Sequence, residues 1–332
     1  MAWRDVVSVV GAICLTGCGG SGVESTPPPV QTPTPTPTPT PTSPILTPVS
    51  QQAAPAPLPS VTTGTLIDAV KTNADFRTGS IEVSDNTRTG ELTSANRRYD
   101  SPNSIRVYFD AKEGKYIVSN IIGTAHRFPD GYSFYGGEGL TTYGQNAADG
   151  VRRLNLLTPV ANNPRIALTY TSYGVWQFDS SDRSNIDPQI NNYHFFYFGI
   201  PTPADAVPRT GSAGYAGLAQ GVLFDSQGTY ALDGTMTLNA DFAAATLTTA
   251  LNLRGTNTSN GLLIVIPAVS GTATIGAGAN SFRGEVSTAD NSFVGSVLGS
   301  FFGPTAQEVG YSFGINSPDL TRIGGGVAVG KR

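Results

Sequence analysis

The sequence predicts an all-β protein with an irregular β domain followed by a small eight-stranded antiparallel β-barrel, preceded by a disordered Pro/Thr-rich linker. Apolar and polar residues alternate over 229–241 and again over 246–254, which gives each strand one buried and one solvated face. Shorter apolar runs over residues 64–200 are separated by long Gly-, Asn- and Asp-rich loops. A strict Thr-Pro repeat at residues 32–42 lies before both regions and cannot fill a core.

The C-terminal region has the clearest strand pattern. We expect eight strands there, at about residues 213–224, 229–241, 245–254, 262–274, 280–287, 292–302, 309–316 and 322–330. Glycines inside these strands suit the bends and close contacts of a closed barrel, whose interior at this strand number is filled by side chains. The second face of the best strands is Thr, Asn, Asp and Arg, which disfavours a barrel that spans a membrane.

The preceding region is β-rich but irregular. The expected strands are residues 104–109, 115–119, 167–171 and 193–198, and residues 66–70 could begin a short helix.

The N-terminal residues resemble a lipoprotein export signal. A short apolar run at residues 6–15, too short to span a bilayer, leads into Leu15-Thr16-Gly17-Cys18, which is similar to a bacterial lipobox. We therefore expect a signal peptide at 1–17 and Cys18 as the lipidated first residue of the mature chain, carrying palmitate-type acyl chains. A short apolar leader that ends in Cys18 by chance is the alternative.

Residues 18–60 form the expected linker, a semi-rigid polyproline II stalk of about 130 Å at ~3.1 Å per residue when fully extended. A globular domain on such a stalk is typical of surface display, and a passive periplasmic tether is the other reading. Gly19 and Gly20 lack the aspartate that holds enteric lipoproteins at the inner membrane.

Charge and motif content disfavour nucleic-acid binding and catalysis. The formal net charge is −4 and no Lys/Arg cluster is longer than a pair, so a nucleic-acid partner is disfavoured. No nucleophile elbow, phosphate loop or zinc-protease motif occurs, and the two cysteines, Cys14 and Cys18, both lie before the expected globular part. We expect no cofactor and no catalytic residue.

The sequence contains few candidate metal ligands. Its two histidines are His126, in a loop-like segment, and His194, which we expect to be a partly buried strand residue rather than a haem or iron ligand. Asp179, Asp182 and Asp187 lack the spacing of a calcium loop, so a solvated turn is expected and no metal site is predicted.

One stretch near the end resembles a known family. Gly299-Ser-Phe-Phe-Gly-Pro-Thr-Ala-Gln-Glu-Val-Gly-Tyr311 is similar to the closing hairpin of the barrel in transferrin-binding protein B and its relatives, with Tyr311 where the family has a second glycine. Thr305 and Glu308 within it have capping-box spacing, which predicts a single helical turn. Tyr170-Thr-Ser-Tyr-Gly-Val-Trp176 resembles a strand of the handle domain that precedes the barrel in such proteins.

The resemblance implies a single lobe, with a handle-like β domain at 61–205 and a barrel at 206–332, linked through 201–208. It also implies a non-catalytic lipoprotein of the Gram-negative outer membrane, exposed at the cell surface, that binds a protein or an iron or haem source. A TonB-dependent receptor and a dedicated outer-membrane translocon would then be its partners. Related single-lobe proteins take haemoglobin or complement factor H, so transferrin is no default.

Partner contacts in such proteins fall mainly on handle loops. The aromatic residues of this region that we expect to contact a partner are Tyr135, Tyr173, Trp176, Tyr193 and Tyr197, since aromatic side chains dominate protein interfaces. About half of the aromatic residues there would simply fill the core. The alternatives for the whole chain are a structural or envelope-tethering lipoprotein without a soluble ligand and, third, a hydrolase.

Replacing Cys18 tests the lipid anchor. Cys18→Ala should release the protein from membranes or leave it unprocessed, because the lipidated residue is lost. Membrane fractionation and incorporation of labelled palmitate measure this, with Cys14→Ala as the control that should behave like the native protein. Unchanged labelling of Cys18→Ala would contradict the assignment.

Overall fold

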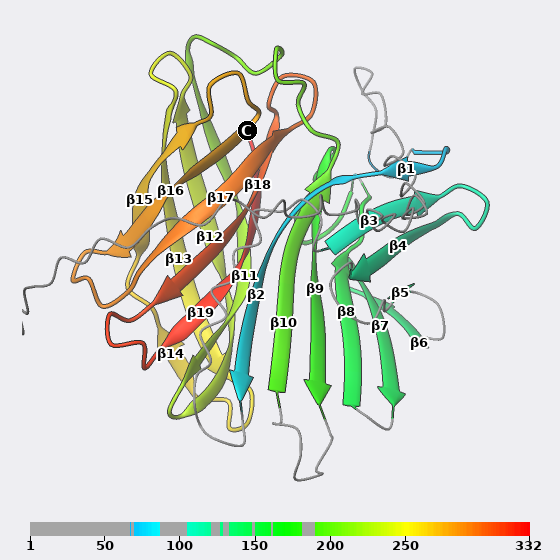
Figure 1. The fold of residues 1–332 in the computed structure, drawn as a ribbon, viewed down its shortest axis with the longest axis vertical. Helices are drawn as coiled ribbons and strands as arrows, with labels where there is room; N and C mark the ends of the chain where they lie inside the picture. The colour runs from blue at the N-terminus through cyan, green and yellow to red at the C-terminus, as the bar shows by residue number, and fades with distance from the viewer. Residues whose placement is uncertain are drawn as a thin grey trace, which may run out of the picture. The chain divides into compact units, whose positions relative to one another are not determined.

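A computed structural model describes residues 67, 70–86, 105–120, 127–128, 133–147, 150–160, 162–180 and 190–332, all within one compact unit, 53–332. Every element in this part of the chain is a β-strand, which confirms the predicted fold class (Figure 1). Of the expected helix at 66–70 only Ile67 and Val70 are described, and His126 lies outside the described residues. Among these residues, no helix has the length and apolar character needed to cross a membrane.

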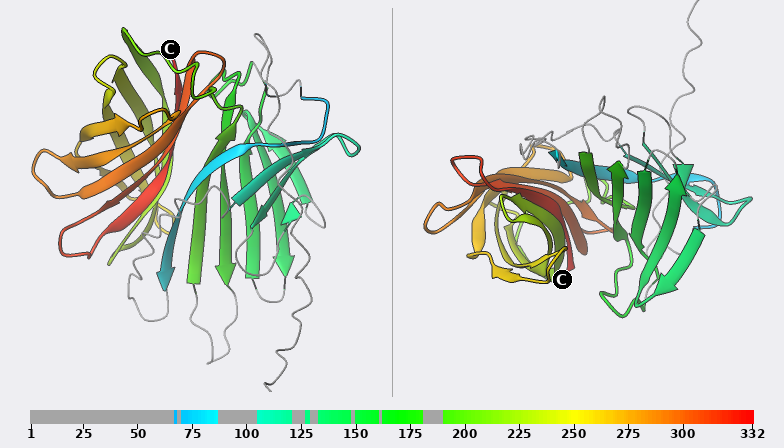
Figure 2. Two further views of the ribbon diagram at one scale, coloured as in Figure 1. Left: turned by 45° about the horizontal axis from the view of Figure 1, so that its top comes forward. Right: turned by 90° about the horizontal axis from the view of Figure 1, so that it is seen from below.

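The C-terminal half forms a closed antiparallel barrel. Its strands are β11 (Ser212–Asp225), β12 (Gly228–Asp241), β13 (Thr246–Asn257), β14 (Leu263–Val265), β15 (Val269–Ile275), β16 (Ser281–Thr288), β17 (Val294–Phe302), β18 (Glu308–Asn316) and β19 (Ile323–Lys331). The order β12-β11-β19-β18-β17-β16-β15-β13 closes because β12 also pairs with β13. Figure 2 shows the ring end-on in its right-hand view.

The eight predicted strands are present, and one is interrupted. The expected strand at 262–274 is β14 followed by β15, which both pair with β13. The ladder breaks at residues 266–268, where Pro267 has no backbone N–H to donate. β14 continues past the end of β16, so its outer edge has no partner strand among the described residues.

Inward side chains fill the barrel as the alternation predicts. Phe301, Phe313 and Tyr311 are fully buried in one cluster that includes residues of every long barrel strand. Tyr311 stands where the family has glycine, and its hydroxyl lies 2.9 Å from the Thr249 hydroxyl inside the barrel. Burial raises the pKa of Tyr311 far above its ordinary value, so the hydroxyl stays protonated and pairs with Thr249.

The described residues before the barrel, up to Ile200, form two sheets that we call the handle. Its strands are β1 (Ala74–Asp75), β2 (Arg77–Asn86), β3 (Ile105–Asp110), β4 (Lys115–Asn120), β5 (Arg127–Phe128), β6 (Ser133–Gly137), β7 (Leu140–Ala147), β8 (Gly150–Leu157), β9 (Thr171–Ser180) and β10 (Ile190–Gly199). The orders are β1-β3-β4-β5 and β2-β10-β9-β8-β7-β6.

Both faces of the six-stranded sheet are covered. One face packs with the four-stranded sheet in a core that includes Trp176, Phe196 and Phe198. The other face packs on the outer wall of the barrel, where Phe195 and Tyr197 share a cluster with barrel residues. Strands expected at 104–109, 115–119 and 193–198 correspond to β3, β4 and β10, whereas the strand expected at 167–171 is wrong. That segment is a loop, and β9 begins at Thr171.

The barrel core accounts for much of the stability. Phe301→Ala and Phe313→Ala should each lower the free energy of unfolding by roughly 3–5 kcal/mol, because each removes a fully buried ring. Chemical denaturation measures the change. Asn239→Ala, on the exposed face of β12, is the control and should leave the midpoint nearly unchanged. Unaltered unfolding of both phenylalanine variants would contradict the observed register.

Candidate functional site

The handle lies against the barrel because two outward positions of β18 and β19 are glycines. A Cβ at Gly310 would come within 3.0 Å of the Tyr197 ring, and one at Gly325 within 2.9 Å of Val83 Cγ2. At these two positions the sheet approaches the barrel backbone more closely than a side chain would allow. The sequence predicts close contacts at strand glycines, and at Gly325 the contact partner is the handle.

A buried carboxylate joins the two domains. Glu308 accepts hydrogen bonds from the backbone N–H groups of Thr169 (2.5 Å), Tyr170 (2.8 Å) and Thr171 (2.9 Å). The predicted capping box is wrong: the Glu308 carboxylate turns away from Thr305 toward the handle. The same bonds explain why residues 167–171 do not form the predicted strand. The backbone N–H groups of 169–171 donate to the Glu308 side chain instead of to a neighbouring strand.

The charge state of Glu308 is set by two opposing effects. Burial raises the pKa of the carboxyl above its ordinary value, while the three donated N–H groups and the nearby Lys331 act against this rise. The carboxylate is thus costly to bury and depends on its three donors.

The linker between the domains adds further bonds at the same end of the barrel. Thr202 donates its hydroxyl to the Gly303 carbonyl at 2.7 Å and its backbone N–H to the Phe301 carbonyl at 3.0 Å. Asn280 donates to the Thr202 carbonyl at 2.5 Å. Gly303, with φ of 82°, adopts the left-handed conformation that this corner requires.

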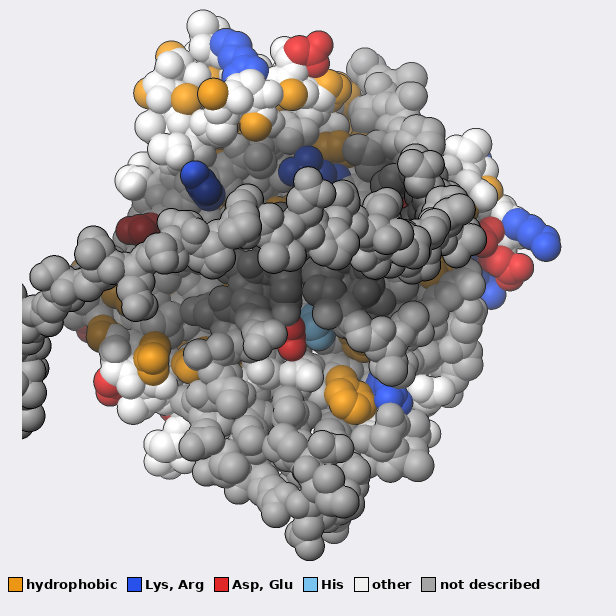
Figure 3. Space-filling model, in the orientation of Figure 1, with side chains coloured by type: hydrophobic (Ala, Val, Ile, Leu, Met, Phe, Trp, Pro, Cys, Tyr) orange, Lys and Arg blue, Asp and Glu red, His pale blue; other side chains and the backbone are white. Residues whose placement is uncertain are grey.

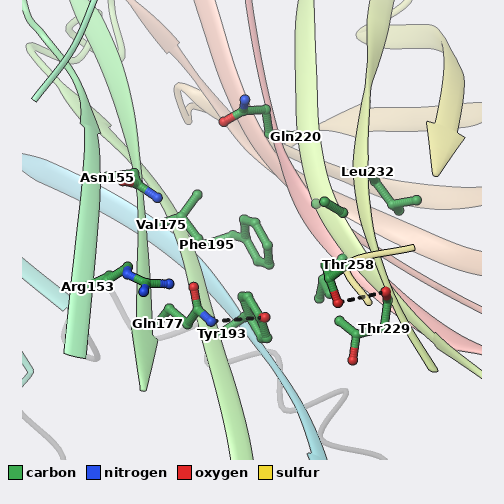
Figure 4. A pocket seen from close by; sticks show the side chains of 13 residues that line it. Arg153, Asn155, Val175, Gln177, Tyr193, Phe195, Gln220, Thr229, Leu232 and Thr258 are labelled. Atoms are coloured by element: carbon green, nitrogen blue, oxygen red, sulfur yellow. Dashed lines mark hydrogen bonds between the residues drawn. The ribbon is translucent and has the colours of Figure 1, made fainter. Parts of the chain in front are cut away.

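A cleft with a volume of about 490 Å³ lies between the handle sheet and the barrel wall. Its handle side consists of two cross-strand rows, and the residues are Arg153, Gln177 and Tyr193 in one row and Asn155, Val175 and Phe195 in the other. Its barrel side includes Gln220 and Val222 of β11, Thr229 and Ala231 of β12, and Thr258. Figure 4 shows the two sets facing each other, with the Gln177 amide donating to the Tyr193 hydroxyl at 3.1 Å.

The cleft opens toward the end of the barrel that lies away from Glu308. Tyr193 packs near Phe224, at 5.9 Å between ring centroids, beside the turn that joins β11 to β12. The turns after β13 and β16 and before β19 lie at this same end, as do the adjoining ends of β2, β9 and β10. The described barrel turns and the ends of these handle strands therefore lie at one end of the molecule (Figure 1).

The structure buries most of the aromatic residues expected to contact a partner. Tyr173, Trp176 and Tyr197 are 0%, 3% and 3% exposed. Trp176 lies in the core between the two handle sheets, and Tyr173 and Tyr197 lie in the core between handle and barrel, so none of them stands free on a loop. Tyr193 is half-buried and reaches the cleft. Tyr135 lies in β6, and its side chain falls outside the described residues. Sequence reasoning missed Arg153, Gln220 and the junction role of Glu308, although Glu308 stands in the motif that suggested the family.

The described histidine is a strand residue packed against its neighbours. His194 Nε2 lies 4.0 Å from Glu82, and its ring lies 5.7 Å from that of Trp176. Burial lowers its pKa, with Glu82 acting in the opposite direction. No group of three or more His, Cys, Asp or Glu that could hold a metal occurs among the described residues. Asp182 and Asp187 lie outside them, as does the side chain of Asp179. On the face drawn in Figure 3, the coloured basic side chains are scattered and form no single patch.

Comparison with known sequences identifies relatives of the barrel. Residues 207–331 match the family model described as the C-lobe and N-lobe β-barrels of transferrin-binding protein B. Transferrin-binding protein B of Haemophilus influenzae strain 86-028NP is 26% identical over 176 residues, which cover 46% of this chain and 26% of that protein. The chain thus matches about a quarter of the length of this curated relative.

Solved structures show similar matches. The isotype 1 transferrin-binding protein B of serogroup B Neisseria meningitidis is 16% identical, with a TM-score of 0.40 and coverage of 76% of this chain and 43% of that one. The N-lobe of lactoferrin-binding protein B from Moraxella bovis is 14% identical, with a TM-score of 0.32, and the match covers 79% of this chain and 100% of the lobe.

Removing the junction carboxylate tests its role. Glu308→Ala should lower the free energy of unfolding by about 2–4 kcal/mol, because it leaves buried N–H donors of residues 169–171 without an acceptor. Amide hydrogen exchange should then accelerate at those three residues while the barrel strands keep their protection. Glu285→Ala removes an exposed carboxylate from β16 and is the control. Equal stability of both variants would contradict the proposed junction.

Proposed function

We propose that this chain, whose residues 207–331 match the family model of the transferrin-binding protein B barrels, is a surface-exposed, lipid-anchored protein that binds a protein or iron-source ligand without catalysis. The N-terminal lipobox and stalk, read from the sequence, support an outer-membrane anchor in a Gram-negative cell. These features do not identify the ligand, and transferrin itself is one candidate among several.

The observation that carries this proposal is the arrangement of the turns. Handle and barrel are held together near Glu308, and the turns of the barrel lie at the opposite end beside the ends of β2, β9 and β10. A rigid scaffold that presents loops at one end is the usual way in which a binding site is built without catalytic groups. Such an end can face an extracellular partner when the domain stands on a stalk.

Exposed apolar residues at this end are better candidate contacts than the buried tyrosines. Leu262, Leu263 and Val265 are 55%, 70% and 80% exposed, on and beside the short strand β14. Apolar side chains that are exposed together on a soluble domain often mark a protein contact. The open edge of β14 also offers backbone groups to an extended segment of a partner.

Direct binding to named iron-carrying proteins tests the function. We expect the full-length chain to bind one of transferrin, lactoferrin or haemoglobin in biolayer interferometry, and protease shaving of intact cells to remove it from the surface. Double replacement of Leu263→Ser and Val265→Ser should weaken the complex at least tenfold, about 1.4 kcal/mol. Val160→Ser, at an exposed valine beyond β8 and away from β14, is the matched control and should leave binding unchanged.

The other outcomes are equally informative. Full resistance to shaving, together with absence of binding to all three proteins, would favour an envelope-tethering lipoprotein. Turnover of a chemical substrate by the purified chain would contradict the proposal outright.

A further inference from the structure

We propose that the cleft between handle and barrel is a binding site for a small amphiphilic organic anion, whose carboxylate-type head meets Arg153 and whose apolar body lies against Val175 and Ala231. This inference goes beyond the binding of a protein partner, since it concerns a separate cavity and a different class of ligand. It stands on the charge, the hydrogen-bond donors and the apolar wall of that cavity.

Arg153 supplies the charge. It is the one charged residue among the 13 that line the cleft, and it makes no ion pair or hydrogen bond with any described residue. Another arginine of the described chain, Arg254, lies 3.6 Å from a carboxylate, Asp233. Arg153 is exposed at the cleft, and none of the described lining residues is a carboxylate, so its guanidinium is open to an anionic ligand, which it can bind with two parallel N–H groups.

Two amides extend the donor set around Arg153. Asn155 accepts the Thr142 hydroxyl at 2.9 Å through its side-chain oxygen, which leaves its NH₂ group to donate into the cleft. The side chain of Gln220, on the barrel side, makes no hydrogen bond with the described residues. Donors from handle and barrel thus line one cavity, and a carboxylate can accept from the donors on the handle side.

Part of the remaining wall is apolar. Val175 is half-buried and lies between Asn155 and Phe195 in the same cross-strand row, and Ala231 is exposed on the barrel side. Phe195 and Val222 lie behind this surface and are almost fully buried. A volume of about 490 Å³ falls within the ~300–1,000 Å³ range of small-molecule sites. A simple inorganic anion would leave Val175 and Ala231 uncovered, so the fitting ligand carries an organic body beside its charge.

A pair of fluorescent probes that differ only in charge tests the proposal. Dansylglycine carries a carboxylate on an aromatic body, and dansylglycinamide is its neutral counterpart. With the full-length chain, dansylglycine should bind at least tenfold more tightly than the amide, as measured by the rise in dansyl emission. Arg153→Gln should abolish that preference, and Arg153→Lys should restore part of it.

Two further variants separate the cleft from other surfaces. Ala231→Phe fills the cleft from the barrel side and should weaken both probes, whereas Arg283→Gln removes an exposed arginine elsewhere on the barrel and should change neither. Equal binding of the two probes, undiminished binding in Arg153→Gln at an unchanged melting temperature, or no binding of either probe would overturn the proposal. The probes require no partner protein, so this result is independent of the interferometry experiment with iron-carrying proteins.

Discussion

A single buried carboxylate governs how this chain is put together. Glu308 begins β18 of the barrel, yet its oxygens bond the backbone of residues 169–171 in the handle. Those amides would otherwise be buried without acceptors or would require a neighbouring strand, and either would alter where β9 begins. The Gly303-Pro304 corner is accordingly longer than a two-residue hairpin, because it positions a carboxylate that belongs to the junction as much as to the barrel.

The shape of the interface follows from which barrel residues lack side chains. Gly310 and Gly325 let the handle sheet approach β18 and β19 at van der Waals distance. On β11 and β12 the outward residues that face the handle, such as Gln220 and Ala231, line the cleft instead. The handle sheet contacts the curved barrel closely at β18 and β19. It does not follow the curve of the barrel as far as β11 and β12, and the cleft lies there.

The sequence could predict what depends on near neighbours. Alternation placed the barrel strands and the inward orientation of Phe301 and Phe313. It failed at residues 167–171 and at Glu308, because the bonds that decide both join residues more than 130 positions apart. The burial of Tyr173 and Trp176 could not be predicted from alternation either. The two residues lie on opposite faces of a sheet, and alternation does not show that both faces are packed against other sheets.

The junction and the proposed recognition surface occupy opposite ends of the barrel. The bonds of Glu308, Thr202 and Asn280 hold handle and barrel together at one end. The other end carries the exposed apolar residues beside β14 and the unpaired Arg153 of the cleft. Since substitutions at the second end disturb few buried bonds, ligand preference can change there while the junction stays intact. A scaffold divided in this way can accept different ligands on one fold.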